Sequence, residues 1–204
     1  MLIDISRPIH SAMAIYPGNP GVELLQIQKA GVEQSGLTAI SLGSHTGTHI
    51  DALSHINASN SGIESFSLDQ YVGDCEVVEI PPDVAVITSA HIPETGSKRI
   101  IFKTANSNFS VDEFRADFTA LDESAAEKIA QLGIVLVGLD ALSIKKKGIK
   151  DRVHEILLTH NIVIVEGLYL PDIQPGPYQL MCLPLSIPGI DGVPARAVLS
   201  SYEN

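Results

Sequence analysis

The strongest constraint on the fold is a repeated pattern in the second half of the chain, where a helical segment precedes a short apolar run. Residues 122–131 have the spacing of an amphipathic helix, with Asp122 as its N-cap and Gly133 as its stop. The apolar run 134–139 follows, and a second helical segment, about residues 151–159, precedes the run 162–165. Short runs without alternation are typical of strands covered on both faces. This order predicts an α/β fold with a parallel or mixed sheet and packed helices.

The first half of the chain predicts mainly strands. Turn residues separate short apolar runs at residues 1–5, 22–28 and 37–42, and two further runs lie at residues 75–80 and 99–103. The length of 204 residues suits one domain, which we expect to span residues 1–204. Hydrophobic residues make up 45% of the chain and charged residues 18%, a balance that permits a packed core.

Charge and composition limit the classes of partner. The chain has 13 basic and 24 acidic residues, and its net charge of −11 opposes binding to nucleic acid or to anionic membrane surfaces. No apolar stretch approaches the length of a membrane span, and no export signal is evident, so the cytoplasm is the expected location. Cys75 and Cys182 are expected to be buried free thiols. A small molecule is the expected substrate class.

Residues 45–55 contain three of the seven histidines and one carboxylate: His45, His49, Asp51 and His55. All four occupy odd positions, and odd positions share one face of an extended strand. Imidazole and carboxylate groups without thiolate suit zinc, manganese or another divalent ion. A single histidine in a strand is usually an ordinary polar residue. Three histidines and an aspartate at alternating positions instead predict a metal or catalytic site.

The remaining ligands are expected from the second helix and strand, which offer His154, His160 and Glu166. From residue 154 to 160 a helix advances roughly 9 Å, and a strand from 162 to 166 returns about 13 Å. Glu166 therefore returns level with the start of the helix, where His154 can meet it and His160 cannot. Glu166 also closes an apolar run, where a bare carboxylate is costly without a cation or hydrogen bonds. The alternative is that Glu166 simply emerges into solvent.

The histidine cluster reads His-Thr-Gly-Thr-His-Ile-Asp-Ala-Leu-Ser-His. It resembles the motif His-x-Gly-Thr-His-x-Asp-x-Pro-x-His of the cyclase-like metal-dependent hydrolases, which include bacterial kynurenine formamidases and isatin hydrolases. Leu53 stands where the motif has proline and affects backbone stiffness but no ligand. The resemblance extends along nearly the whole chain, through residues 16–18, residues 138–140 with Ser143, His154 with Glu166, residues 184–185 and residues 194–197.

The resemblance implies a role for each site residue. His45, His49 and Asp51 would hold one metal together with Glu166, and Asp51 and Glu166 would bridge to a second metal held by His154. His55 would be the general acid and base. Tyr16 would line the substrate pocket, at a position where the closest formamidases have tryptophan. The implied fold is a swivelling β/β/α-type domain of the cyclase fold with a mixed sheet, and family members form homodimers or higher homo-oligomers.

The leading hypothesis is an arylformamidase-like hydrolase that uses one or two divalent ions, zinc or alternatively manganese, to hydrolyse a small aryl amide such as N-formylkynurenine. An isatin-hydrolase-like enzyme, or a cyclase or dehydratase acting on another small cyclic substrate, would use the same ions as Lewis acids. A metal-stabilised binding protein without catalysis is the third hypothesis, because closed metal sites can be purely structural.

Overall fold

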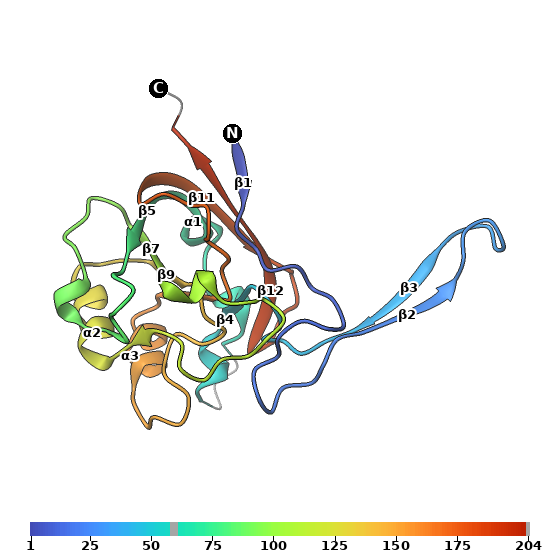
Figure 1. Ribbon diagram of the computed structural model, residues 1–204, viewed down its shortest axis with the longest axis horizontal. Coiled ribbons are helices and arrows are strands. Elements are labelled where there is room, and N and C mark those ends of the chain that lie inside the picture. The colour runs from blue at the N-terminus through green and yellow to red at the C-terminus, as the bar shows by residue number, and fades with distance from the viewer. Residues whose placement is uncertain (58–60, 203–204) are drawn as a thin grey trace.

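A mixed sheet of eight strands that closes on itself forms the body of the protein (Figure 1). The structure is a computed structural model and describes residues 1–57 and 61–202. In sheet order, the strands are β1 (Leu2–Asp4), β12 (Gly192–Ser201), β11 (Gly176–Pro184), β5 (Val72–Glu79), β7 (Arg99–Lys103), β9 (Leu136–Leu139), β10 (Val163–Glu166) and β4 (His49–Asp51). Strand β4 pairs with β10 on one side and with β12 on the other, so this short strand closes the sheet into a barrel.

The sheet has a parallel half and an antiparallel half. Strands β5, β7, β9 and β10 are parallel to their neighbours in that order, whereas the pairs that involve β11, β12, β4 and β1 are antiparallel. A parallel pair needs a crossover connection. Helix α2 (Glu123–Gln131) precedes β9, and helix α3 (Val153–Thr159) connects β9 to β10; the two helices pack together at one side of the body (Figure 1).

The other elements are short. Helix α1 (Leu68–Tyr71) begins with a capping box formed by Ser67 and Gln70. Strands β6 (Val86–Ile87) and β8 (Ala120–Leu121) form a small parallel pair. The 3-10 helices are η1 (Leu53–His55), η2 (Ile63–Ser65), η3 (Ser89–His91) and η4 (Ala105–Asn108). No helix in the described ranges is long and apolar enough to cross a membrane.

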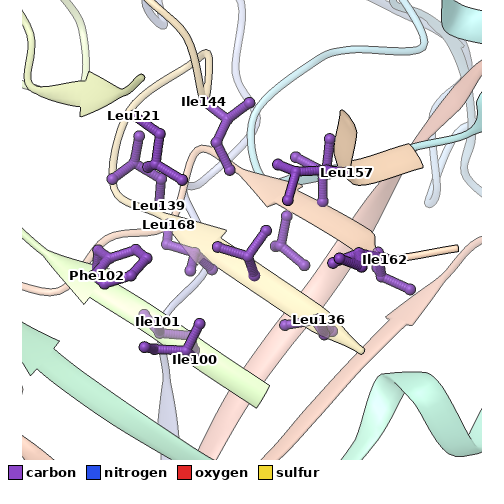
Figure 2. Packing of buried hydrophobic residues seen from close by; sticks show 14 of the residues in the cluster. Ile100, Ile101, Phe102, Leu121, Leu136, Leu139, Ile144, Leu157, Ile162 and Leu168 are labelled. Carbon is purple, nitrogen blue, oxygen red and sulfur yellow. The ribbon is translucent and has the colours of Figure 1, made fainter. Parts of the chain in front are cut away.

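The hydrophobic core fills the space between the parallel strands and the helices (Figure 2). All residues of β9 and β10 are buried, and so are the first four of β7. Figure 2 shows Ile100, Ile101 and Phe102 of β7 beside Leu136 and Leu139 of β9. This burial on both faces explains the apolar runs 100–102, 136–139 and 163–165 in these strands.

The structure confirms the predicted α/β class with a mixed sheet. Helix α2 has Asp122 as its N-cap, whose carboxylate accepts a hydrogen bond from the Ala125 N–H at 3.0 Å. Cys75 and Cys182 are buried and free. Strands β11 and β12 were not predicted, because their sequences mix proline, glycine and polar residues with only partial alternation. These two strands complete the barrel.

A β-hairpin arm projects from the body (Figure 1). It consists of β2 (Glu23–Gln28) and β3 (Leu37–Ser41), and every residue of both strands is exposed. The arm carries exposed large apolar side chains, namely Leu24, Leu25, Ile27, Val32, Leu37 and Ile40. A two-stranded hairpin alone is at best marginally stable in water. This arm therefore has an apolar surface that its own chain does not cover.

Candidate active site

Three short elements bring most of the predicted site residues together. His49 and Asp51 lie two residues apart on β4, so their side chains share one face of the strand. Glu166 ends β10 directly opposite His49. His154 lies in the first turn of α3, and its Nε2 is 3.1 Å from Glu166 Oε1. This distance agrees with the helix and strand geometry that selected His154; the ring of His160 instead contacts the Ile156 carbonyl oxygen at 2.7 Å.

His45 and His55 reach the site by a route that was not predicted. The expected extended strand over residues 45–55 is wrong, because only His49–Asp51 is a strand. Gly47 has a φ of 65°, in the left-handed region that favours glycine, and turns the chain after His45. His55 ends the 3-10 helix η1. The rings of His45 and His55 nevertheless lie 4.2 Å apart between centroids, so the turns gather the histidines without strand alternation.

Two buried carboxylates form the centre of the site. Asp51 is fully buried, and its two oxygens lie 2.8 Å from His45 Nδ1 and 3.4 Å from His154 Nε2. Glu166 lies 3.2 Å from His49 Nε2 and 3.1 Å from His154 Nε2. Each carboxylate therefore contacts imidazoles from two different parts of the chain.

Two buried atoms at this centre form no hydrogen bond within the described residues: His49 Nε2 and Asp51 Oδ2. A buried polar atom without a partner is costly, and a bound cation is one way to satisfy it. The other nitrogen of His49 contacts the Gly47 carbonyl oxygen at 2.9 Å, and donating its proton there leaves Nε2 with a free lone pair directed at the carboxylates. These nitrogen and oxygen donors fit a divalent metal ion.

The local charges shift the pKa values of the histidines around the carboxylates upward. Burial alone lowers the pKa of His45, but its contacts with Asp51 and Asp191 outweigh burial and raise it to about 9. Burial also opposes protonation of His154, yet Asp51 and Glu166 raise its pKa to about 10. The pKa of His49 is raised for the same reason. The site therefore attracts positive charge strongly, as protons or as metal ions.

His55 differs from the other three histidines. It is the most exposed of them, and its ring lies 5.5 Å from the His154 ring between centroids. Desolvation lowers its pKa, and the His45 and His154 imidazoles add to this effect although Asp51 opposes it. Its donor atoms lie close enough to His45 and Asp191, or to Asp51 and His154, to join a metal cluster. Its neutral ring at physiological pH can also accept a proton.

Two backbone features fix Glu166 in place. The Ile144 N–H donates to Glu166 Oε1 at 2.6 Å. Gly167 follows with a φ of 70°, and a Cβ atom there would lie 2.2 Å from the Gly47 carbonyl oxygen. Only glycine allows β10 to approach the turn before β4 this closely. The two glycines hold the two halves of the site against each other.

The structure adds one acidic residue that sequence reasoning missed. Asp191 lies in the connection between β11 and β12, and its Oδ2 is 3.0 Å from His45 Nε2. In the sequence it precedes Gly192, and an Asp-Gly pair is an ordinary signal for a turn. Only the pairing of β12 with β4 reveals its contact with His45.

The site opens into a cleft of about 610 Å³, which lies in the usual size range for small-molecule sites. The cleft is lined by His45, His55, His154 and Glu166, together with Tyr16 and Ser143. Tyr16 packs edge to face against Phe114, with ring centroids 5.4 Å apart. A rigid aromatic wall therefore stands beside the histidines.

Comparison with known proteins gives the family of this chain. The Cyclase family model matches residues 3–146, which is more than half of the chain. The chain belongs to the cyclase family. It is 34% identical to a kynurenine formamidase of Salinibacter ruber, with coverage of 97% of this chain and 96% of that protein. It is 32% identical to a kynurenine formamidase of Maricaulis maris, with coverage of 96% of each chain.

Solved structures show the same cyclase-family fold. A potential metal-dependent hydrolase with cyclase activity superposes with a TM-score of 0.85 at 30% identity, over 98% of this chain and 96% of that chain. Isatin hydrolase A from Labrenzia aggregata superposes with a TM-score of 0.82 over 98% of this chain and 93% of that chain. Its identity of 19% shows likeness of fold alone.

Proposed function

We propose that this cyclase-family protein is a metal-dependent amidohydrolase of the kynurenine formamidase type, which hydrolyses a small aryl amide such as N-formylkynurenine. One observation carries the proposal: two buried carboxylates, three histidines and a neutral His55 meet beside a small-molecule cleft. Similarity over nearly the full length to proteins named kynurenine formamidase supports the choice of substrate class.

The proposed ligands follow from the donor atoms. His45, His49 and Asp51 would hold one ion together with Glu166. Asp51 and Glu166 each have two oxygens that contact different histidines, so both could bridge to a second ion held by His154. Zinc is the proposed metal, because it accepts imidazole and carboxylate ligands, and manganese is the alternative. When bound, such an ion polarises a carbonyl oxygen and lowers the pKa of water.

His55 is proposed to move protons during hydrolysis. Its lowered pKa keeps the ring neutral at pH 7, so it can accept a proton from attacking water and deliver it to the leaving amine. Its exposure to the cleft leaves the ring accessible to a substrate. Tyr16 is proposed to pack against the aryl ring of the substrate, since its own ring is held by Phe114 in the cleft wall.

The test combines a metal-loaded substrate screen with a variant of His55. Zinc-loaded protein should hydrolyse N-formylkynurenine faster than isatin or simple lactones. His55→Ala should keep its metal but lose about 10² to 10⁴ in kcat, the usual contribution of a general acid or base. His160→Ala, a change outside the cleft lining, is the matched control. Wild-type turnover in His55→Ala, or activity only on lactones, would contradict the proposal.

Chelation of the metal tests the alternative that the metal is purely structural and the protein is not an enzyme. If chelation abolished activity and left the fold intact, catalysis would be supported. Cooperative unfolding on chelation, in a protein that turns over none of the three substrate classes, would show that the metal serves the fold.

We further propose that copies of this chain associate through the β2–β3 arm into a homodimer or a higher homo-oligomer. Large exposed apolar surfaces mark interaction sites. Strand alternation places Leu25, Leu37 and Ala39 on one face of the arm, and Leu25 and Ala39 are directly paired. A second copy is present whenever the first is, so it can cover this face permanently.

A further inference from the structure

The ring of His45 contacts a second carboxylate, that of Asp191, on the side opposite Asp51. Its Nδ1 lies 2.8 Å from Asp51 Oδ1, whereas its Nε2 lies 3.0 Å from Asp191 Oδ2. The Asp191 carboxylate also accepts a hydrogen bond from the Ser44 hydroxyl at 3.3 Å. The two ring nitrogens therefore face two different carboxylates, one inside the site and one at its rim.

The backbone around Asp191 is fixed to the metal-binding strand. The Ala52 N–H, directly after Asp51, donates to the Asp191 carbonyl oxygen at 2.9 Å. The next residue, Gly192, pairs with Asp51 in the β4–β12 ladder. These two backbone contacts hold the chain at Asp191 and Gly192 against β4 and the residue that follows it. They keep the Asp191 carboxylate in a defined place beside His45.

Gly192 supplies the space for the imidazole ring. A Cβ atom at Gly192 would lie 2.5 Å from Cε1 of His45 and 3.0 Å from each ring nitrogen. The ring therefore occupies the space that a side chain at Gly192 would need, and any side chain there would displace it. The φ of Gly192 is not in the left-handed region, so the reason for glycine at this position is the contact with His45.

We propose that Asp191 and Gly192 are positioning residues that hold His45 in one ring orientation and one tautomer for metal binding. This inference rests on the metal site proposed above. With the proton on Nε2 donated to Asp191, the lone pair of Nδ1 is directed into the site. A carboxylate that accepts the second N–H of a ligating histidine fixes its orientation and increases its basicity, and its loss typically costs 10- to 100-fold in metal affinity.

The competing arrangement makes Asp191 a metal ligand itself. Donor atoms of His45, His55 and Asp191 lie close enough together to hold an ion. The two arrangements predict different effects when the carboxylate of Asp191 is replaced by the amide of asparagine. The oxygen of asparagine still accepts the histidine N–H, more weakly than a carboxylate does, but it does not supply the charge of a carboxylate ligand.

The test measures zinc affinity of the whole protein by competition with a chromophoric chelator. Asp191→Ala and Gly192→Ala should each bind zinc about 10- to 100-fold more weakly, whereas Asp191→Asn should stay within about threefold of wild type. Asp112→Ala removes another aspartate–histidine contact of 3.0 Å, at His10 and outside the site, and should have no effect. Gly96→Ala adds a Cβ where nothing lies within 4 Å and is the second control.

A spectroscopic readout separates positioning from general weakening. In a long-range ¹H–¹⁵N spectrum, zinc-loaded wild type and Asp191→Asn should show His45 with its proton on Nε2, and Asp191→Ala should lose this single tautomer. Equal zinc affinity of Asp191→Ala and wild type would overturn the inference alone. Equal losses in Asp191→Asn and Asp191→Ala would overturn it in favour of a ligand. Failure of wild type to bind zinc would overturn the proposed metal site, and this inference with it.

Discussion

Zinc loading of the metal-free protein at pH 7 should release at least about two protons per chain, one each from His45 and His154. The histidines that contact Asp51 and Glu166 have raised pKa values, about 9 for His45 and about 10 for His154, and the pKa of His49 is raised as well. The rings of His45 and His154 are therefore protonated at pH 7 before zinc arrives. A ligating imidazole must give up the proton on its ligating nitrogen, so each of them releases one.

The carboxylates should release none. The pKa of Asp51 lies well below its ordinary value and that of Glu166 is lowered too, because the surrounding imidazoles outweigh the effect of burial. One pKa unit corresponds to about 1.4 kcal/mol. Displacing the protons at pH 7 thus costs about 3 kcal/mol at His45 and about 4 kcal/mol at His154. Zinc affinity should rise with pH from 7 to 9, about tenfold per pH unit for each of His45 and His154 while that ring is protonated in the metal-free protein.

Calorimetric titration in two buffers of different ionisation enthalpy measures the number of protons released. His154→Gln should release about one proton fewer, and His160→Gln should match wild type. Stoichiometric zinc binding with fewer than one proton released per chain, or an affinity that does not change between pH 7 and 9, would contradict this prediction. The metal-free protein should also lose stability as the pH rises from 6.5 to about 10, since a raised histidine pKa stabilises the fold only while the ring is protonated.

Two further predictions concern the glycine junction and the arm. Gly167→Ala should lower the free energy of unfolding by about 3 kcal/mol or more in chemical denaturation, because its Cβ would meet the Gly47 carbonyl oxygen. The control Gly148→Ala has a similar left-handed φ but nothing within 4 Å of its Cβ, and it should lower the free energy of unfolding by only about 1–2 kcal/mol. Equal losses in the two variants would show that the close approach does not matter. Leu25→Glu should weaken self-association about thirtyfold or more, measured by light scattering after size-exclusion chromatography. The control Leu68→Glu changes an exposed apolar position on α1 and should leave self-association unchanged. Unchanged association of Leu25→Glu would show that the arm is not part of the interface.

Three of the four strands in the parallel half could be predicted because they are buried on both faces. Burial explains the apolar runs 100–102, 136–139 and 163–165 in β7, β9 and β10, and the caps of α2 gave that helix clear ends. Strands β11 and β12 lie in the antiparallel half, where exposed and buried residues mix and proline occurs within the strands. They pair with each other, but their other partners, β5, β4 and β1, are far away in the sequence.

The candidate site shows the same division between local and long-range information. The meeting of His154 with Glu166 followed from the rise per residue in a helix and a strand, which are fixed by backbone geometry. The convergence of His45 and His55 was predicted from an extended strand, but a turn at Gly47 and a 3-10 helix that ends at His55 bring the two rings together instead. Asp191 could not be found from its neighbours, since only barrel closure carries it to His45.

Barrel closure by β4 also sets the order in which the site can assemble during synthesis. His49 and Asp51 leave the ribosome early, but one of the two strands that pair with theirs is β12, near the opposite end of the sequence. Until residues 192–194 emerge, the strand with these two residues has a free edge, and Asp191 emerges directly before them. The side chains of His49 and Asp51 are therefore without their complete scaffold while residues 52–191 are synthesised. The complete site forms only when the last strand is in place.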